Sequence, residues 1–173
     1  MATIDVKTLT KTVAGLVKSL NPRNRDIVSR RFGLKSGTKE TLESIGKSYS
    51  ITRERVRQIE EFALAQLTKT SGDTKDLVKV ISAAKDLIVR EGGVMGERAM
   101  FKAVSGSDRD SVANASLVFA LTLDRELVRT AENDHVHAFW ARDAKTLTAF
   151  RRRSQHSPVL WRAMAPCWHP LSW

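Results

Sequence analysis

The sequence predicts a mainly α-helical protein, with a helix-turn-helix unit in its N-terminal part and a winged helix of three helices and a β-hairpin in its C-terminal part. Three observations predict this class. Apolar residues recur at steps of three and four in several segments, which is the period of an amphipathic helix. Residues that cap helices stand at the ends of these segments. Two short runs typical of strands, 127–130 and 135–140, flank the polar residues 132–134 and indicate the hairpin.

Two helices are expected in the first 33 residues. An apolar stripe would pack either on the core of the unit or on a partner helix; it consists of Leu9, Val13, Leu16, Val17 and Leu20. Asn21 followed by Pro22 is a strong start signal, and Gly33 supplies the matching stop. The arginines of this second helix could face phosphates or simply solvent; they are Arg23, Arg25, Arg30 and Arg31.

Residues 41–60 predict a complete helix-turn-helix. The first helix runs from Leu42 to about Tyr49 with Thr41 as its N-cap, and Gly46 would let a partner helix approach closely. The second helix follows Thr52, which can cap it. Its core face consists of Val56, Ile59, Ala63 and Leu67.

The opposite face of the second helix is chemically mixed: Glu54, Arg57, Gln58 and Glu61, with Arg53 at the margin. Arginine can fork onto guanine, glutamine can pair with adenine, and glutamate can accept from cytosine. In a helix-turn-helix, the N-terminal part of the second helix lies in the major groove of DNA. This face could therefore recognise base pairs. The alternative is an ordinary charged surface with pairs such as Arg57 to Glu61.

Four segments carry a family resemblance: residues 20–25 (LNPRNR), 31–34 (RFGL), 41–46 (TLESIG) and 52–60 (TRERVRQIE). Together they resemble region 4 of the sigma-70 family of bacterial RNA polymerase sigma factors, over about residues 16–67. The resemblance implies a domain that binds double-stranded DNA at the −35 promoter element and docks on the flap of the polymerase β subunit.

The resemblance also implies a set of DNA-binding residues. Arg53, Glu54, Arg57 and Gln58 would contact bases or adjacent phosphates. Other basic groups would fix the register on the DNA backbone; these are Arg23, Arg25, Lys47 and Arg55, and the N-cap residues Thr41 and Thr52 complete the expected set.

One departure from the family limits what we expect. About fifteen residues precede the matching part, too few for the region 2 with which such factors grip the polymerase and melt the −10 element. We therefore expect a detached promoter-binding module, or a divergent factor that relies on other contacts, and not a complete housekeeping sigma factor.

Basic charge is concentrated in the N-terminal part and the C-terminal tail of the chain. Residues 1–70 carry 14 Lys and Arg against 7 Asp and Glu, residues 71–144 carry 10 against 12, and residues 145–173 carry 5 against none. The basic charge of the helix-turn-helix part favours nucleic acid. The single cysteine, the lack of a signal peptide and the lack of an apolar run of about 18 residues predict a cytoplasmic, nucleoid-associated protein that does not enter a membrane.

The C-terminal part resembles, more weakly, the HARE-HTH winged-helix domain over residues 75–143. The expected division is 1–68 for the helix-turn-helix domain, 69–75 for a polar linker, 76–144 for the winged helix and 145–173 for a basic tail. The mild negative charge of the winged helix favours a protein contact, with polymerase as the candidate. For the tail, rich in Trp and Pro, disorder, a partner-binding peptide and an altered reading frame all stay open.

Sequence signals for catalysis are missing. No phosphate-binding loop, paired catalytic carboxylates or nucleophile motif appears, so we expect no enzyme, no cofactor and no small-molecule substrate. Cys167 and His169 are too few for a structural zinc site, so no metal is expected. Two hypotheses follow: a promoter-binding transcription initiation protein, or a protein that binds polymerase or an anti-sigma partner with weak or no sequence-specific DNA binding.

Overall fold

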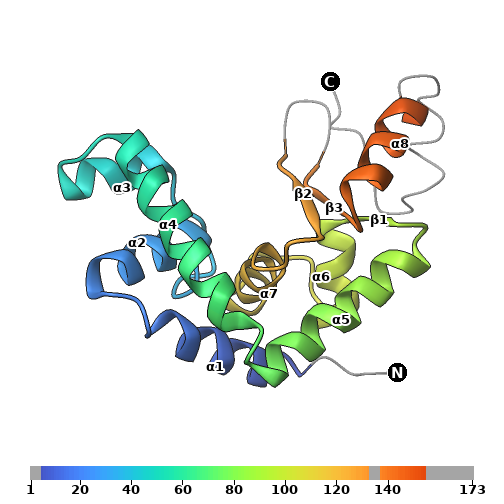
Figure 1. Ribbon diagram of the computed structural model, residues 1–173, viewed down its shortest axis with the longest axis horizontal. Helices are drawn as coiled ribbons and strands as arrows, with labels where there is room; N and C mark the ends of the chain where they lie inside the picture. Colours follow the sequence, from blue (N-terminus) through green and yellow to red (C-terminus); the bar gives the residue numbers. More distant parts are fainter. Residues whose placement is uncertain (1–4, 133–136, 155–173) are drawn as a thin grey trace. The chain divides into compact units, whose positions relative to one another are not determined.

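The computed structural model describes residues 5–132 and 137–154, which contain eight helices and three short strands (Figure 1). The predicted mainly α-helical class is confirmed. The described residues divide into two compact units, 5–81 with 109–124, and 82–108 with 125–132 and 137–154. The domain boundaries expected from the sequence stay a prediction, and the observed division groups residues 109–124 with the first unit.

Both of the first two helices have a capping side chain, and the second begins and ends at the predicted residues. Helix α1 (Val6–Val17) follows Asp5, whose carboxylate accepts a hydrogen bond from the Lys7 backbone N–H at 3.0 Å. Helix α2 (Pro22–Phe32) follows Asn21, whose side chain accepts from the Asn24 backbone N–H at 2.8 Å. It ends at Gly33, which has a φ of 73°. Only glycine adopts this left-handed conformation without strain, so Gly33 stops the helix as predicted.

Helices α3 (Leu42–Tyr49) and α4 (Arg53–Ser71) form the predicted helix-turn-helix. Ile27 of α2, Ile45 of α3 and Val56 of α4 are fully buried together. Partly buried side chains pack around them; these are Leu42, Tyr49, Ile51 and Ile59. Each of the three helices thus contributes one residue to the centre of this cluster. Because the cluster fixes which face of α4 is buried, it also fixes which face meets solvent.

Gly46 permits the close approach of the turn and, as expected, of a partner helix, since a Cβ there would also lie 3.5 Å from the backbone nitrogen of Arg53, the first residue of α4. A Cβ at Gly46 would lie 2.7 Å from the carbonyl oxygen of Ile51, closer than real Cβ contacts. The Ile51 backbone N–H donates to the Gly46 carbonyl oxygen at 3.0 Å. The missing side chain therefore lets the turn between α3 and α4 fold back onto α3.

The apolar stripe of α1 packs within its own unit, against helix α7 (Val112–Thr122) and α4. Its members are buried: Leu9, Val13, Leu16, Val17 and Leu20. Phe32 of α2 meets Phe119 of α7 edge to face, with ring centroids 5.1 Å apart. The first of the two expectations for the stripe, a place in the core of the unit, is therefore correct, and α7 is part of that core.

The polar segment after residue 68 is more ordered than the expected linker at 69–75. Helix α4 continues to Ser71, and helix α5 (Lys75–Arg90) begins four residues later. The hydroxyl groups of Thr68 and Ser71 donate to the carbonyl oxygens of Leu64 and Thr68 at 2.8 and 2.9 Å. These hydroxyls are satisfied inside the helix, so the polar residues extend α4 instead of ending it.

The second unit contains a three-stranded antiparallel sheet, where a two-stranded hairpin was expected. Its strands are β1 (Val94–Gly96), which precedes helix α6 (Glu97–Ser105), β2 (Val128–Thr130) and β3 (Phe139–Ala141). Strand β3 lies in the middle and pairs with both β1 and β2. The expected hairpin corresponds to β2 and β3, although β3 is shorter than the run 135–140. Residues 133–136 lie outside the described part.

The beginning of the expected tail is a helix. Helix α8 (Ala144–Ser154) follows Asp143, whose carboxylate accepts from the Thr146 backbone N–H at 2.7 Å. Leu147 and Phe150, three residues apart, pack with Phe139 of β3. The tail expected from residue 145 thus begins as a helix, which one capping residue and two apolar side chains join to the sheet. Residues 155–173, including Cys167 and His169, lie outside the described part.

Candidate nucleic-acid interface

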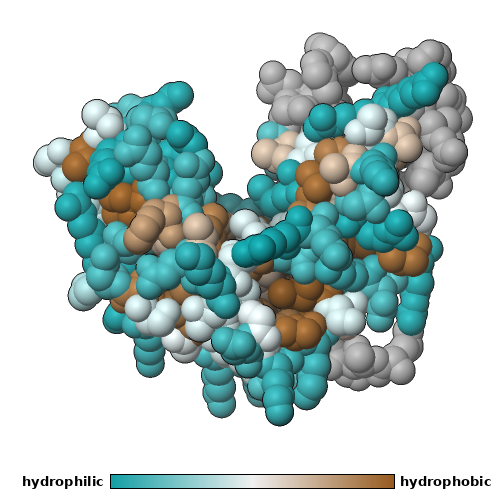
Figure 2. All heavy atoms as spheres, in the orientation of Figure 1, coloured by the Kyte–Doolittle hydropathy of each residue, from teal (hydrophilic) through white to brown (hydrophobic). Residues whose placement is uncertain are grey.

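The first two turns of α4 present charged and polar side chains to solvent. Thr52 accepts from the Arg55 backbone N–H at 3.1 Å and so caps the helix, as predicted. The next side chains outside the core are exposed: Arg53, Glu54, Arg55, Arg57 and Gln58. On the face shown in Figure 2, hydrophilic residues cover the region where α4 begins. The exposed face predicted from helical spacing is therefore present.

Arg57 is held by two carboxylates of its own helix. Its Nε and Nη2 atoms lie 3.0 and 2.6 Å from the two carboxylate oxygens of Glu54, and its Nη1 atom contacts Glu61. The hydrogen bonds from Arg57 lower the pKa of Glu54, and those with Glu54 raise the pKa of Arg57. The surface pair weighed as an alternative, Arg57 to Glu61, thus exists. Exposed ion pairs contribute little, so a base or phosphate can replace them.

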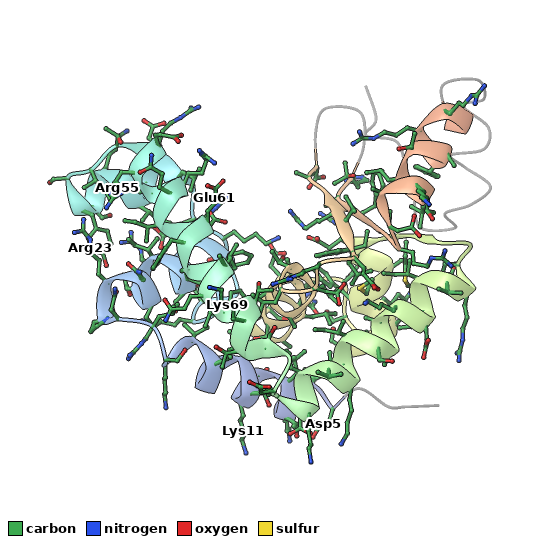
Figure 3. All side chains as sticks on the ribbon, viewed as in Figure 1. Asp5, Lys11, Arg23, Arg55, Glu61 and Lys69 are labelled. Carbon is green, nitrogen blue, oxygen red and sulfur yellow. The ribbon has the colours of Figure 1, made fainter. Side chains whose placement is uncertain are left out.

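Arg55 and Gln58 form a second pair near the start of α4. Arg55 donates from Nη1 to the side-chain oxygen of Gln58 at 3.1 Å. Arg55 and Glu61 leave α4 on different sides, and Lys69 lies further along the helix (Figure 3). The face therefore holds arginine, glutamine and glutamate within two turns, the three residue types that pair with guanine, adenine and cytosine.

Two of the predicted residues, Thr41 and Lys47, lie at opposite ends of α3. Thr41 caps α3 by accepting from the Ser44 backbone N–H at 3.1 Å. The ammonium group of Lys47 lies 2.9 Å from the carboxylate of Glu43, and both side chains are largely exposed. Lys47 is thus available to a phosphate, and the Thr41 hydroxyl, which accepts as a cap, keeps its own O–H as a donor.

The two predicted arginines at the start of α2 differ in surroundings. Arg23 is exposed, with its guanidinium 5.5 Å from the ring centroid of Tyr49. Arg25 donates from Nη2 to the carbonyl oxygens of Lys18 and Leu20 at 2.9 and 3.0 Å. These carbonyls follow the end of α1, so Arg25 joins α1 to α2. The structure thus gives Arg25 a structural use beside the predicted contact with DNA.

Arg30 and Arg31 have partners within the protein, a third possibility beside the two expected from the sequence. Arg30 binds both carboxylate oxygens of Glu40 at 2.9 and 2.7 Å. Arg31 lies 3.2 Å from the Glu60 carboxylate and donates to the Glu40 carbonyl oxygen at 3.1 Å. Both arginines are half-buried, and their ion pairs and hydrogen bonds hold α2 against α4 and the loop before α3. The sequence offered no signal for them, because their partners are far away along the chain.

Tyr49 and Asp26 form a further tie that sequence reasoning missed. The Tyr49 hydroxyl donates to the Asp26 carboxylate at 2.8 Å, and Lys35 lies 3.3 Å from the same group. The hydrogen bond from Tyr49 lowers the pKa of Asp26, while burial raises the pKa of Tyr49. The pair joins α2 to α3 at the edge of the apolar cluster, and so supports the orientation of the helix-turn-helix.

Among residues 5–132 and 137–154, no three His, Cys, Asp or Glu side chains gather closely enough to hold a metal ion. In the same residues, no helix combines the length and the apolar character needed to cross a membrane.

The segment that contains α2, α3 and most of α4 matches the model of a known family. Residues 16–69 match the family model for sigma-70, region 4. The resemblance inferred from the four segments is therefore confirmed over nearly the same residues. The weaker resemblance of the second half to the HARE-HTH domain stays a prediction.

Relatives of known function match the same region 4 segment. RNA polymerase sigma factor SigA1 of Synechococcus elongatus is 46% identical over 59 residues, which are 34% of this chain and 15% of that protein. The principal sigma factor HrdD of Streptomyces coelicolor is 44% identical over 59 residues, 34% of this chain and 18% of that protein. SigA of a Nostoc species is 50% identical over 52 residues, 30% and 13% respectively. This chain thus spans less than a fifth of the length of these relatives.

Proposed function

We propose that this protein binds double-stranded DNA at a −35-like promoter element and contacts bacterial RNA polymerase, acting in transcription initiation by binding and not by catalysis. The observation that carries the proposal is the region 4 match at residues 16–69, whose α4 offers its first two turns to solvent. Such a protein works in the cytoplasm, at the nucleoid.

In the proposed complex, α4 lies in the major groove with its N-terminal end toward the bases. Arg53, Glu54, Arg57 and Gln58 contact base edges or adjacent phosphates. Lys47, Arg55 and Arg23 hold the DNA backbone, because phosphate contacts set the register of a helix in the groove. Thr41 and Thr52 act through the helices that they cap, with Arg25 positioning α1 against α2. The flap of the β subunit is the polymerase surface that the resemblance implies.

A second candidate function is protein binding with weak or no sequence-specific DNA binding, the partner being polymerase or an anti-sigma protein. One observation favours it: Arg57 already has two carboxylate partners on α4, Glu54 and Glu61. A DNA acceptor must displace at least one of them. Under this second function the same exposed face of α4 would bind a protein.

The two functions differ in their dependence on DNA sequence. Fluorescence anisotropy can compare the full chain on a labelled duplex with a −35-like element and on a scrambled duplex of equal composition, at several salt concentrations. The proposal expects tighter binding to the element. Arg57→Ala should raise Kd for the element about 10- to 100-fold and hardly change it for the scrambled duplex.

Lys79→Ala is the matched control for loss of a paired, exposed cation outside the helix-turn-helix. Lys79 lies on α5, 3.7 Å from Asp76. Its replacement should leave the preference for the element unchanged. Equal Kd values for the two duplexes in the wild type would support the second function.

A further inference from the structure

Arg57 is an unusual group for a surface helix, because Glu54 and Glu61 engage it from the turn before and the turn after. The three side chains are about half exposed, at 47%, 56% and 60% respectively. The core needs none of them, since α4 contacts it through Val56 and Ala63 on another face. The charged group is therefore not required for the packing of α4 on the core.

The two carboxylates use different edges of the guanidinium. Glu54 takes the side edge formed by Nε and Nη2, at 3.0 and 2.6 Å. An arginine has five N–H donors, so the end edge formed by Nη1 and Nη2 stays able to fork onto two acceptors such as guanine O6 and N7. Glu61 contacts Nη1, which belongs to that end edge. Glu54 therefore orients Arg57, whereas Glu61 occupies part of the edge that would bind a base.

We propose that Glu61 is a specificity-determining residue of the α4 surface, which competes with a nucleic-acid acceptor for the end edge of Arg57. This inference rests on the proposed DNA-binding function and adds to it a residue outside the expected DNA-binding set. While Glu61 holds Nη1, the protein gains less from a guanine opposite Arg57 than an unopposed arginine would. Glu61 thus limits both the affinity for the site and the preference at that base pair.

A carboxylate near DNA also repels phosphates, whatever its neighbours. The competing role predicts something more, namely that the effect of Glu61 requires Arg57. A double-mutant cycle separates the two effects, because only a coupled pair gives a change that depends on the partner.

The experiment measures Kd of the full-length wild type, Glu61→Gln, Arg57→Ala and the double variant on the preferred duplex. A second duplex differs from it at one base pair, the position at which Arg57→Ala reduces the preference for one base over the others. Glu43→Gln is the matched control, since Glu43 is also exposed on the helix-turn-helix and pairs with Lys47 four residues later at 2.9 Å. Glu61→Ala repeats the test, and circular dichroism checks that each variant is folded.

We expect Glu61→Gln to lower Kd on the preferred duplex about two- to five-fold, the range of an exposed ion pair. It should also widen the difference between the two duplexes, and most of the gain should vanish when Arg57 is alanine. An equal gain with and without Arg57, or a gain no larger than that of Glu43→Gln, would overturn the inference and leave the proposed function intact. Failure of the wild type to bind any duplex would overturn both.

Discussion

Replacing Gly46 by alanine tests the close approach that shapes the helix-turn-helix. The added Cβ would lie 2.7 Å from the Ile51 carbonyl oxygen, where ordinary contact begins at 3.4 Å. The turn must move, and overpacking of this kind costs roughly 1–3 kcal/mol. Alanine favours a helix by about 1 kcal/mol over glycine and offsets part of this. We expect Gly46→Ala to lower the free energy of unfolding by up to about 2 kcal/mol.

Gly15→Ala is the control for the helix propensity alone. Gly15 lies on α1 with no atom within 4 Å of a Cβ added there, so this variant should be more stable than the wild type by about 0.5–1 kcal/mol. Urea unfolding followed by far-ultraviolet circular dichroism measures both changes. With a dependence on urea of about 1–3 kcal/mol per molar, the two midpoints should differ by roughly 1 M. A midpoint for Gly46→Ala equal to or above that of Gly15→Ala would refute the reasoning.

Three further predictions concern side-chain ties. Tyr49→Phe removes the hydrogen bond that lowers the pKa of Asp26, so the wild type should be more stable by about 1 kcal/mol at neutral pH. This difference should shrink as the pH falls below about 4, the ordinary pKa of an aspartate, because Asp26 in the native protein is protonated only at lower pH; a difference independent of pH would contradict it. Arg129→Met removes the guanidinium that lies 2.6 Å from the buried Glu97 carboxylate. It should lower the free energy of unfolding, measured in urea, by about 3 kcal/mol. Adding Glu97→Gln should restore part of this loss, whereas equal stability of the single and double variants would count against the pair. Asp143→Ala should speed amide hydrogen exchange in α8. Hydrogen bonding lowers the pKa of Asp143 from 3.8 to about 2, so in the wild type the protection of α8 amides against exchange should fall only between about pH 4 and 2. Protection that is unchanged in the variant would show that α8 does not depend on this cap.

The helix-turn-helix could be located from the sequence because its signals are local. A capping side chain bonds to a backbone N–H three residues later, so Asn21, Thr41 and Thr52 mark helix starts without knowledge of the fold. The spacing of apolar residues then showed which face of α4 is exposed. The placement of Arg57 on that face was predicted in the same way, and its role in binding DNA stays a prediction.

The features that sequence reasoning missed depend on distant partners. Strand β1 has three residues and becomes a strand only by pairing with β3, far along the chain. Helix α8 was hidden by the basic, Trp- and Pro-rich composition that follows it, although Leu147 and Phe150 have helical spacing. Arg30 can donate hydrogen bonds to Glu40 and Ser48 only when α2, α3 and the loop between them are folded. Such contacts have no signature within a short window of residues.

Selection from a randomised duplex pool tests the central claim most directly. The full-length protein would be incubated with the pool at moderate salt, with and without core RNA polymerase, and the retained DNA sequenced. The account predicts enrichment of one −35-like element, which Arg57→Ala weakens at a single base position. Retention of polymerase without enrichment of any sequence would contradict it, and would identify the protein as a polymerase-binding regulator.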